Sequence, residues 1–232
     1  MRKISLIIPV FNDNEELLKL LHHFQNVTNI EYIEIIIVSA DLHNELTGRV
    51  DSKIKILHSK IACRAIQLNS GAAEATGEIL YFVHADTLPP ISLVKDINDA
   101  VEAGQLMGGY RLKFNPNSIM LKINSFLTRF STKFSGGGDQ TLYITKDLFE
   151  KYEGYDERYC IMEDFELVHR LKPVHGYYII PKNVIVSSRK YLYNNYLRVN
   201  FANYQAFKMY RRKVAPEIIK EYYYASLHKV KI

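Results

Sequence analysis

The chain has 232 residues, of which 47% are hydrophobic, enough to fill the core of one α/β domain with or without a helical appendage. This composition excludes a disordered chain. The formal net charge of +5 is modest, and we expect no nucleic-acid partner. No stretch reaches the ~18 continuous apolar residues of a membrane-spanning helix.

Two features bear on the compartment. The cysteines, Cys63 and Cys160, are too few for a disulfide framework, and we expect single buried thiols in a reducing compartment. The N-terminal apolar run is short, is interrupted by Pro9 and ends at Asn12 and Asp13, which indicates a first strand rather than a signal peptide. We therefore expect a cytoplasmic protein.

The first ninety residues alternate between strand and helix patterns. Continuous apolar runs are typical of strands buried on both faces. In chain order the predicted elements are a strand at Ile4–Val10, a helix from Asn14, strands at Ile33–Ser39 and Lys53–Leu57, a helix at Ala62–Thr76 and a strand at Glu78–Val83. This order predicts an α/β fold with a mostly parallel, Rossmann-like sheet flanked by helices.

The rest of the chain continues the mixed pattern. The predicted elements are a helix near Ser92–Glu102, a strand at Gln105–Phe114, a helix at Asn117–Phe134, a strand at Thr141–Thr145, a helix starting near Met162 and a mainly helical region after Tyr191. Glycine-rich residues Ser135–Gln140 interrupt the chain between two of these elements. We find no internal repeat in the sequence and no linker long enough to divide two independent domains.

Polar side chains follow three of the predicted strands, at Phe11–Asp13, Ser39–Asp41 and His84–Asp86. Ligands of such sheets bind beyond the carboxyl ends of the strands, so these segments are expected to surround the site. His84 and Asp86 are the candidate metal ligands, because side chains two positions apart on an extended segment point the same way. Aspartate suits Mg²⁺ or Mn²⁺, which proteins often hold with one or two groups plus substrate phosphates. Polar residues that simply end a strand are the alternative.

Glu163, Asp164 and Glu166 place three carboxylates within four residues at a predicted helix start. The helix dipole alone favours acidic residues there. The functional alternative makes Asp164, with Glu163 beside it, a general base, because neighbouring acids in a cleft raise the pKa of a carboxylate toward the useful range.

Two further segments carry candidate binding residues. Asp139 and Gln140 follow three glycines and can bond hydroxyl groups, although glycines also simply make turns. If residues 63–77 are helical, Arg64 and Gln67 lie on one face, and Arg64 can meet a phosphate. Asn69 points away from that face, where it is expected to tie down a loop.

Taken together, three segments resemble the family 2 glycosyltransferases of the GT-A fold. They are ISLIIPVFNDNEE, CRAIQLNSGAAEATGEILYFVHADTLPP and GGGDQTLYITKDLFEKYEGYDERYCIMEDFELVHRLK. The match is closest to a small bacterial branch labelled radical-SAM/selenodomain-associated transferases, which shares the His-Ala-Asp motif. That branch also has an Arg-aromatic pair and a helix in its tail, similar to SSRKYLYNNYLRVNF here. The resemblance covers roughly Ile4 to Tyr224.

The resemblance implies a GT-A domain at residues 1–190, with a nucleotide half up to about residue 90 and an acceptor half after it. A helical extension at residues 191–232 would pack on this domain. The implied activity is hexosyltransferase-like: a sugar moves from a UDP- or GDP-sugar to an unknown acceptor hydroxyl, with inversion at the anomeric carbon and with help from Mg or Mn.

The resemblance also implies a role for each candidate residue. The nucleotide would be bound by Pro9, Phe11, Asn12, Glu15, Ser39, Asp41, Arg64, Gln67 and Asn69. Asp86 and His84 would hold the metal, Asp139, Gln140 and Arg170 would face the donor or acceptor, and Asp164 with Glu163 would be catalytic, Asp164 as the base.

The segment after the second strand departs from the family pattern. Relatives usually carry an Asp-Gly-Ser type turn that grips the base and ribose, whereas VSADLHNE puts Ser39 at the first acidic position and lacks the glycines. Asp41 is the candidate substitute. A catalytically degenerate member that binds a nucleotide sugar or a partner is therefore the alternative function. A sugar-phosphate nucleotidyltransferase is disfavoured, because PVFNDNEE is acidic where that class has a basic glycine-rich loop.

The C-terminal region carries a helical stripe of apolar residues that ends in the basic segment Lys208–Lys213. The stripe consists of Leu192, Tyr196, Val199, Ala206 and Tyr210. Packing on the domain or on a second copy in a homodimer is one use of such a helix. Peripheral contact of its basic end with the inner face of a membrane is the other.

Overall fold

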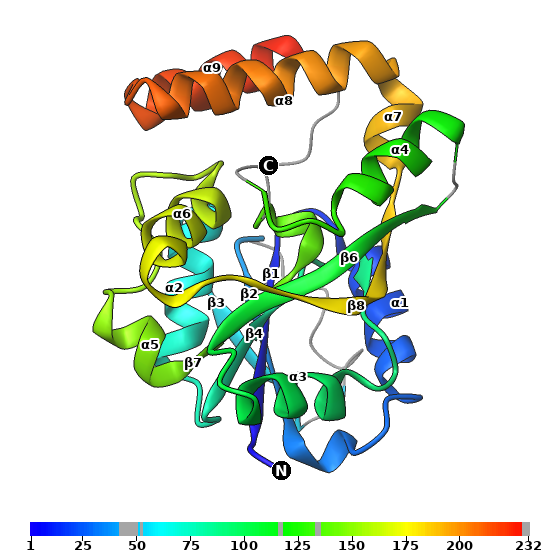
Figure 1. Cartoon of the computed structure of the whole chain (residues 1–232), viewed down its shortest axis with the longest axis vertical. Helices are drawn as coiled ribbons and strands as arrows, with labels where there is room; N and C mark the ends of the chain where they lie inside the picture. Colours follow the sequence, from blue (N-terminus) through cyan, green and yellow to red (C-terminus); the bar gives the residue numbers. More distant parts are fainter. Residues whose placement is uncertain (42–50, 52, 116–117, 133–135, 229–232) are drawn as a thin grey trace.

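The computed structural model describes residues 1–41, 51, 53–115, 118–132 and 136–228 (Figure 1). Within them one sheet has the strand order β3-β2-β1-β4-β7-β6-β8-β5. The strands are β1 (Ile4–Val10), β2 (Ile33–Ser39), β3 (Lys55–His58), β4 (Ile79–Phe82), β5 (Thr87–Leu88), β6 (Met107–Asn115), β7 (Leu142–Thr145) and β8 (Tyr178–Ser187).

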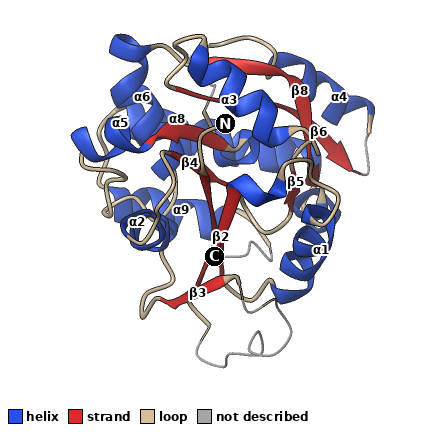
Figure 2. Cartoon of the chain, turned by 90° about the horizontal axis from the view of Figure 1, so that it is seen from below, coloured by secondary structure: helices blue, strands red, loops and turns tan. Residues whose placement is uncertain are grey.

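Helices cover both faces of this sheet (Figure 2). They are α1 (Asn14–Phe24), α2 (Arg64–Ala73), α3 (Leu93–Glu102), α4 (Ile119–Leu127), α5 (Lys146–Lys151), α6 (Glu163–His175), α7 (Arg189–Tyr193), α8 (Tyr196–Arg211) and α9 (Pro216–Ser226). Single 3-10 turns lie at Ile30–Tyr32 and Gly138–Gln140.

Strand β1 lies at the centre of the parallel half. It pairs in parallel with β2 and β4, and β2 pairs in parallel with β3. All seven of its residues are buried. Leu6 packs in the core that includes α1 and α3, whereas Ile7, its neighbour, packs in the core that includes α2 and α6. This alternation explains the continuous apolar run in the sequence, because a strand covered on both faces has no solvent side.

The other half of the sheet mixes directions. β7 runs antiparallel between β4 and β6, β5 runs antiparallel to β8, and β6 is parallel to β8. The predicted α/β fold with a mostly parallel sheet is therefore confirmed. The long strand β8 and the short helix α5 were outside the prediction. The predicted helix Asn117–Phe134 is shorter than expected, since α4 ends at Leu127, and residues 133–134 lie outside the described part.

The two cysteines are not single thiols. Cys63 and Cys160 form a disulfide across a sequence separation of 97 residues, with their Cα atoms 4.7 Å apart. Cys63 directly precedes α2, and Cys160 lies in the loop that leads into α6. Because only the fold brings these two segments together, the sequence spacing gave no sign of the pairing, and the expectation of free thiols is wrong.

Helices α8 and α9 lie side by side above the carboxyl ends of the parallel strands (Figure 1). They are joined to the domain by a small apolar cluster in which Ile161 meets Ala206 of α8 and Ile219 of α9. Among the described residues, no helix has both the length and the apolar character needed to cross a membrane. The arrangement leaves a space between these helices and the sheet edge.

Candidate active site

A cavity of about 1250 Å³ opens at the carboxyl ends of β1 and β4, beneath α8. Two of the three predicted strand ends line it, through Phe11, Asp13, His84 and Asp86. Ten predicted site residues lie in its wall: Pro9, Phe11, Arg64, Gln67, His84, Asp86, Asp139, Gln140, Glu163 and Asp164. The carboxyl-end rule for parallel sheets therefore located the cavity correctly.

Charged side chains gather at the deep end of the cavity. We call this set the cavity floor, and it consists of Asp13, Arg64, His84, Asp86, Glu163, Asp164 and Arg189. These residues come from five separate segments of the chain. The floor has two poles, one around Asp164 and one around Asp86.

The first pole is built on the start of α6. Met162, the residue before this helix, has a left-handed backbone (φ 66°), which turns the chain sharply into the helix. Glu163 and Asp164 follow at once and are only 1% and 6% exposed. Acidic residues that merely complement a helix dipole lie in solvent, so the burial of this pair calls for specific partners.

Asp164 has two neighbours at this pole. The Tyr155 hydroxyl donates a hydrogen bond to Asp164 Oδ1 over 3.3 Å, and His84 Nε2 lies 4.0 Å from Asp164 Oδ2. Burial, and next the negative charge of Glu163, raise the pKa of Asp164 well above its ordinary value, although Arg64 opposes the shift. A carboxyl group with a raised pKa binds a proton more readily than a solvated one, as a general base must.

Glu163 and His84 complete the first pole. Glu163 Oε1 lies 3.4 Å from Arg64 Nη1, and this carboxylate raises the pKa of the guanidinium, which stays charged. Burial, and next the positive charge of Arg64, lower the pKa of His84 to about 4. At neutral pH the His84 ring is therefore neutral and has a free lone pair for a proton or a metal ion.

The second pole is an ion-pair cluster around Arg189. Its guanidinium donates two hydrogen bonds to Asp13, at 3.1 and 3.0 Å, and a third to Asp86 Oδ2 at 3.1 Å. Glu16 of α1 lies 3.5 Å from the same guanidinium. Burial, and next the nearby Asp139, raise the pKa of Asp86, while Arg189 opposes the rise. A partly buried arginine shared by several carboxylates can also meet the oxygens of a phosphate.

The backbone between His84 and Asp86 differs from the expected extended form. It makes a turn, closed by a hydrogen bond from the Thr87 amide to the His84 carbonyl at 3.1 Å, before β5 pairs with β8. As a result the two side chains join different poles: His84 faces Asp164, and Asp86 faces Arg189. The expectation that His84 and Asp86 lie on an extended segment and point the same way is therefore wrong.

The first pole also fits a divalent cation. Ligand atoms of His84, Glu163 and Asp164 lie within 4.8 Å of one another. Glu163 Oε1 is buried and accepts no hydrogen bond from the described part of the chain. One imidazole and two carboxylates suit Mn²⁺ or a similar ion. At the second pole, a cation at Asp86 would share its carboxylate with Arg189.

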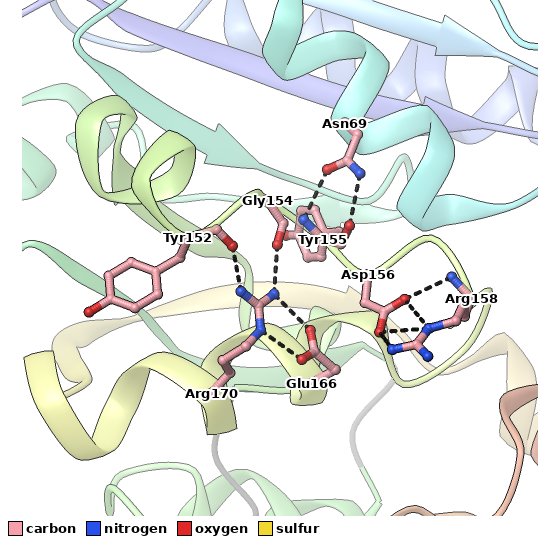
Figure 3. A network of polar contacts seen from close by, with 8 residues as sticks. All are labelled: Asn69, Tyr152, Gly154, Tyr155, Asp156, Arg158, Glu166 and Arg170. Atoms are coloured by element: carbon pink, nitrogen blue, oxygen red, sulfur yellow. Dashed lines mark hydrogen bonds and ion pairs between the residues drawn. The ribbon is translucent and has the colours of Figure 1, made fainter.

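Two predicted binding residues instead brace the loop that follows α5 (Figure 3). Asn69 holds Tyr155 through both of its backbone groups, donating to the carbonyl at 2.9 Å and accepting from the amide at 3.0 Å. Arg170 donates to the carbonyls of Tyr152 and Gly154 and forms an ion pair with Glu166 at 2.7 Å. The expected loop-tying role of Asn69 is confirmed, and both residues act on the loop that carries Tyr155.

Both buried glutamines are bound to backbone groups. The Gln67 side chain donates to the Val10 carbonyl at 3.0 Å and the Val38 carbonyl at 2.8 Å, which fixes the ends of β1 and β2 together. The Gln140 side chain accepts from the Gly136 amide at 3.2 Å and donates to the Tyr110 carbonyl at 3.2 Å. Gln67 and Gln140 thus shape the cavity wall, whereas Asp139 beside Gln140 is exposed to the cavity.

The segment that departs from the family pattern reaches the first loop. Asp41 Oδ1 accepts a hydrogen bond from the Asn12 amide at 2.8 Å, and the Ser39 hydroxyl accepts one from the Asp41 amide at 3.2 Å. Asp41 Oδ2 is buried and has no hydrogen-bond partner among the described residues. Glu15 lies on the exposed side of α1. Leu42 and the residues that follow it in VSADLHNE lie outside the described part.

Three floor or near-floor residues were missed by the sequence analysis: Asp13, Tyr155 and Arg189. Asp13 stood within a strand-end segment that had been singled out, so a sequence signal existed for it. Arg189 lies in the segment that resembles the family tail, but its reach of 176 residues along the chain to Asp13 has no sequence signal. Tyr155 gave no signal either.

The mixed α/β sheet with helices on both faces (Figure 2) is a GT-A-like fold. The model of the family "Glycosyl transferase family 2" matches residues 5–160, and the chain belongs to this family. A comparison with curated protein sequences gave no match.

Solved structures with the same fold include two proteins at low sequence identity, one of them a mannosyltransferase. The structure of S. aureus TarS 1-349 superimposes with a TM-score of 0.65 at 14% identity, covering 86% of this chain and 64% of TarS 1-349. The mannosyltransferase PcManGT from Pyrobaculum calidifontis, in complex with GDP-Man and Mn²⁺, has a TM-score of 0.65 at 17% identity and covers 97% of this chain and 68% of that one. A complex of TarS 1-349 with UDP-GlcNAc gives a TM-score of 0.63 at 16% identity, over 88% of this chain and 65% of the other. The chain thus spans less than two thirds of the TarS fragment.

Proposed function

We propose that this chain is an inverting glycosyltransferase that moves a hexose-type sugar from a UDP- or GDP-sugar to an acceptor hydroxyl. The observation that carries the proposal is Asp164, a buried carboxylate with a raised pKa that lines a cavity at the carboxyl ends of the parallel strands. Complexes of structural neighbours with UDP-GlcNAc and with GDP-Man and Mn²⁺ support the donor class.

In this proposal Asp164 takes the proton of the acceptor hydroxyl as that oxygen attacks the anomeric carbon from the face opposite the diphosphate. The bond to the diphosphate oxygen breaks, and the nucleoside diphosphate leaves with the electron pair. The hydrogen bond from Tyr155 holds the carboxylate in position. Glu163 keeps the pKa of Asp164 high while its own charge is balanced by Arg64.

Cationic groups of the floor would meet the leaving diphosphate. Arg189 and Arg64 both line the cavity and carry charge that balances the oxygens as the bond breaks. A divalent ion, Mg²⁺ or Mn²⁺, would supply the same neutralisation as a Lewis acid. Asp86 and His84 would hold it according to the resemblance, and Glu163 with Asp164 offers the second set of ligands next to His84.

The nucleotide would lie at the ends of β1 and β2. Pro9 and Phe11 line the cavity there, and Asn12 is tied to Asp41. Asp41, whose buried Oδ2 has no hydrogen-bond partner among the described residues, would take the place of the family's acidic turn, and Ser39 would orient it. Gln67, Asn69 and Glu15 would contribute only through the shape of this end of the site. Asp139, with Gln140 behind it, would contact the donor sugar or the acceptor.

We also propose that the chain belongs to the radical-SAM/selenodomain-associated branch, acts in the bacterial cytoplasm and has no nucleic-acid partner. A homodimer is part of the same proposal, and the acceptor is not identified. The cysteines no longer indicate a reducing compartment, because Cys63 and Cys160 form a disulfide. The alternative function is a degenerate module that binds a nucleotide sugar or a partner without turnover, which the altered turn at Ser39 favours.

Calorimetric titration of UDP and GDP, with and without Mn²⁺, tests the proposal on the wild type and on Asp86→Asn, Glu163→Gln and Asp164→Asn. One nucleotide should bind with metal dependence, and whichever variant abolishes that dependence identifies the ligand pole. If the metal lies at Asp86, Asp164→Asn should still bind the nucleotide but lose about 10³-fold in turnover, as removal of a general base does. Absence of nucleotide binding in every condition would rule out the transferase.

A further inference from the structure

Large apolar side chains are exposed around the mouth of the cavity. We call this set the apolar rim. It consists of Ile119, Met120, Ile123, Phe126, Leu127 and Phe130 on and after α4, and Leu192, Tyr193, Leu197, Phe201 and Tyr204 on α7 and α8, each at least 52% exposed. In Figure 1, α4 lies directly below α7 at the end of α8, so the two parts of the rim are neighbours.

The rim reverses the usual orientation of an amphipathic helix. Helix α4 buries only Leu121, while Ile119, Ile123 and Phe126 recur at intervals of three or four residues on its outer side. A stripe at this spacing normally faces the core of the protein. Here the same stripe faces outward, and such exposed apolar surface is the mark of an interaction site.

The two parts of the rim are held together by polar contacts beneath it. Asn124 of α4 donates to Asn200 of α8 at 3.2 Å, and Tyr196 of α8 donates to Asn124 at 2.7 Å. Four rim residues also line the cavity: Leu127, Phe130, Tyr193 and Tyr204. The rim is therefore a continuous outward extension of the cavity wall.

The chain segments that supply the rim carry charge of a single sign. The sequence contains no Asp or Glu from residue 103 to 138 or from residue 167 to 216, the stretches that supply α4, α7 and α8. Arg129 stacks over the Phe126 ring with its guanidinium carbon 5.5 Å from the ring centre. On α8, the exposed stripe of Leu197, Phe201 and Tyr204 continues at helical spacing to Lys208 and Arg211.

We propose that the apolar rim docks on the surface of a bilayer that contains anionic phospholipids, with the mouth of the cavity against the headgroups. Apolar side chains would enter the headgroup boundary, and Lys122, Arg129 and Arg198 would meet lipid phosphates. A second copy of the chain fits this face poorly, since a two-fold contact would oppose two cationic surfaces without carboxylates. The apolar rim is a different surface from the basic segment Lys208–Lys213 that the sequence suggested for membrane contact. Binding of the rim to a bilayer does not depend on transferase activity.

Cosedimentation with vesicles tests the proposal. Vesicles of phosphatidylcholine with about 30% of the anionic lipid phosphatidylglycerol should bind the full chain. Vesicles of pure phosphatidylcholine should bind it much less. The double variant Phe126→Ser/Leu197→Ser should lower the partition coefficient at least about tenfold, because two buried apolar groups are lost. Lys122→Gln/Arg129→Gln should weaken binding and reduce its sensitivity to salt.

Val174→Ser is the matched control, because Val174 is 69% exposed on α6, away from the rim. It should bind vesicles like the wild type. Three results would overturn the proposal: no binding to either vesicle, equal binding to both, or binding that the rim variants leave unchanged. Light scattering measures the oligomeric state of the wild type and of the Phe126→Ser/Leu197→Ser variant. A dimeric wild type and a monomeric variant would also overturn the proposal, because the rim would then be a contact between two copies of the chain.

Discussion

The cavity floor and the apolar rim both contribute to the wall of one cavity and depart from ordinary folding rules in opposite ways. At the floor, Glu163 and Asp164 are acidic side chains held inside the protein. At the rim, Phe126 and Leu197 are apolar groups held outside it. Neither arrangement helps folding, since burying charge and exposing apolar surface both cost stability. The contrast teaches that this region is organised for ligands at both ends.

The two ends also differ in how far along the chain their partners lie. Floor contacts join segments that are distant in sequence, such as Arg64 with Glu163 and Arg189 with Asp86. At the rim, Phe126 contacts Phe130 and Arg129 of its own segment, and the distant contacts are the hydrogen bonds that join α4 to α8. The floor therefore consists of contacts between distant segments, whereas the rim combines local contacts within the α4 segment with a polar link to α8.

The disulfide should have the largest effect on stability, because it holds the floor together. The double variant Cys63→Ala/Cys160→Ala should lose about 4 kcal/mol in the free energy of unfolding, as expected for a closed loop of nearly one hundred residues. Urea denaturation measures this loss. A reductant should destabilise the wild type by the same amount and leave the variant unchanged. An identical denaturation midpoint for both proteins would contradict the pairing.

A matched pair of isoleucines compares core and rim directly. Ile7→Ala should cost about 3 kcal/mol, because Ile7 is fully buried on β1 and its loss leaves a cavity. Ile123→Ala should change the free energy of unfolding by no more than about 0.5 kcal/mol, since Ile123 is 52% exposed. Equal losses for the two variants would show that the rim is packed against the protein and would remove the contrast.

The smallest predicted effect is a shift in the pH dependence of turnover. In the proposed mechanism Asp164 acts as a base only when deprotonated, so activity should fall as the pH drops through its raised pKa. Glu163→Gln removes a negative charge that raises this pKa, and the acid limb should therefore move to lower pH. Glu150→Gln, an exposed change on α5, should leave the limb in place. If Glu163→Gln leaves the acid limb of the pH–activity profile unchanged, Glu163 does not raise the pKa of the base.

The sequence predicted the parts of the fold that depend on local pattern. The bounds of β1 and β2 agree with the apolar runs, because a strand buried on both faces leaves an unbroken signature. The residues at the strand ends were found from the ends of these runs, and the acid pair at α6 was found from three carboxylates within four residues at a predicted helix start. The orientation of α4 was not predictable, because an apolar stripe has the same spacing whether it faces the core or a membrane.

The partners of the site residues could not be predicted either. Asp86 was singled out by its place after a strand, but its partner Arg189 lies 103 residues further along the chain. Tyr155 reaches Asp164 only because a loop is folded back by Asn69 and Arg170. Such contacts are set by tertiary structure, and single-sequence patterns carry no information about them.

The loop before α6 has a mechanical consequence. Asn69 of α2 is hydrogen-bonded to this loop at Tyr155, and Arg170 of α6 is hydrogen-bonded to it at Gly154. The disulfide links Cys160 of the loop to the residue before α2. The base is therefore mounted on the same rigid piece as the helix that packs against β1 and β2. Any displacement of α2 would therefore carry the carboxylate of Asp164 with it, so that in the proposed transferase the position of the base would follow the position of α2.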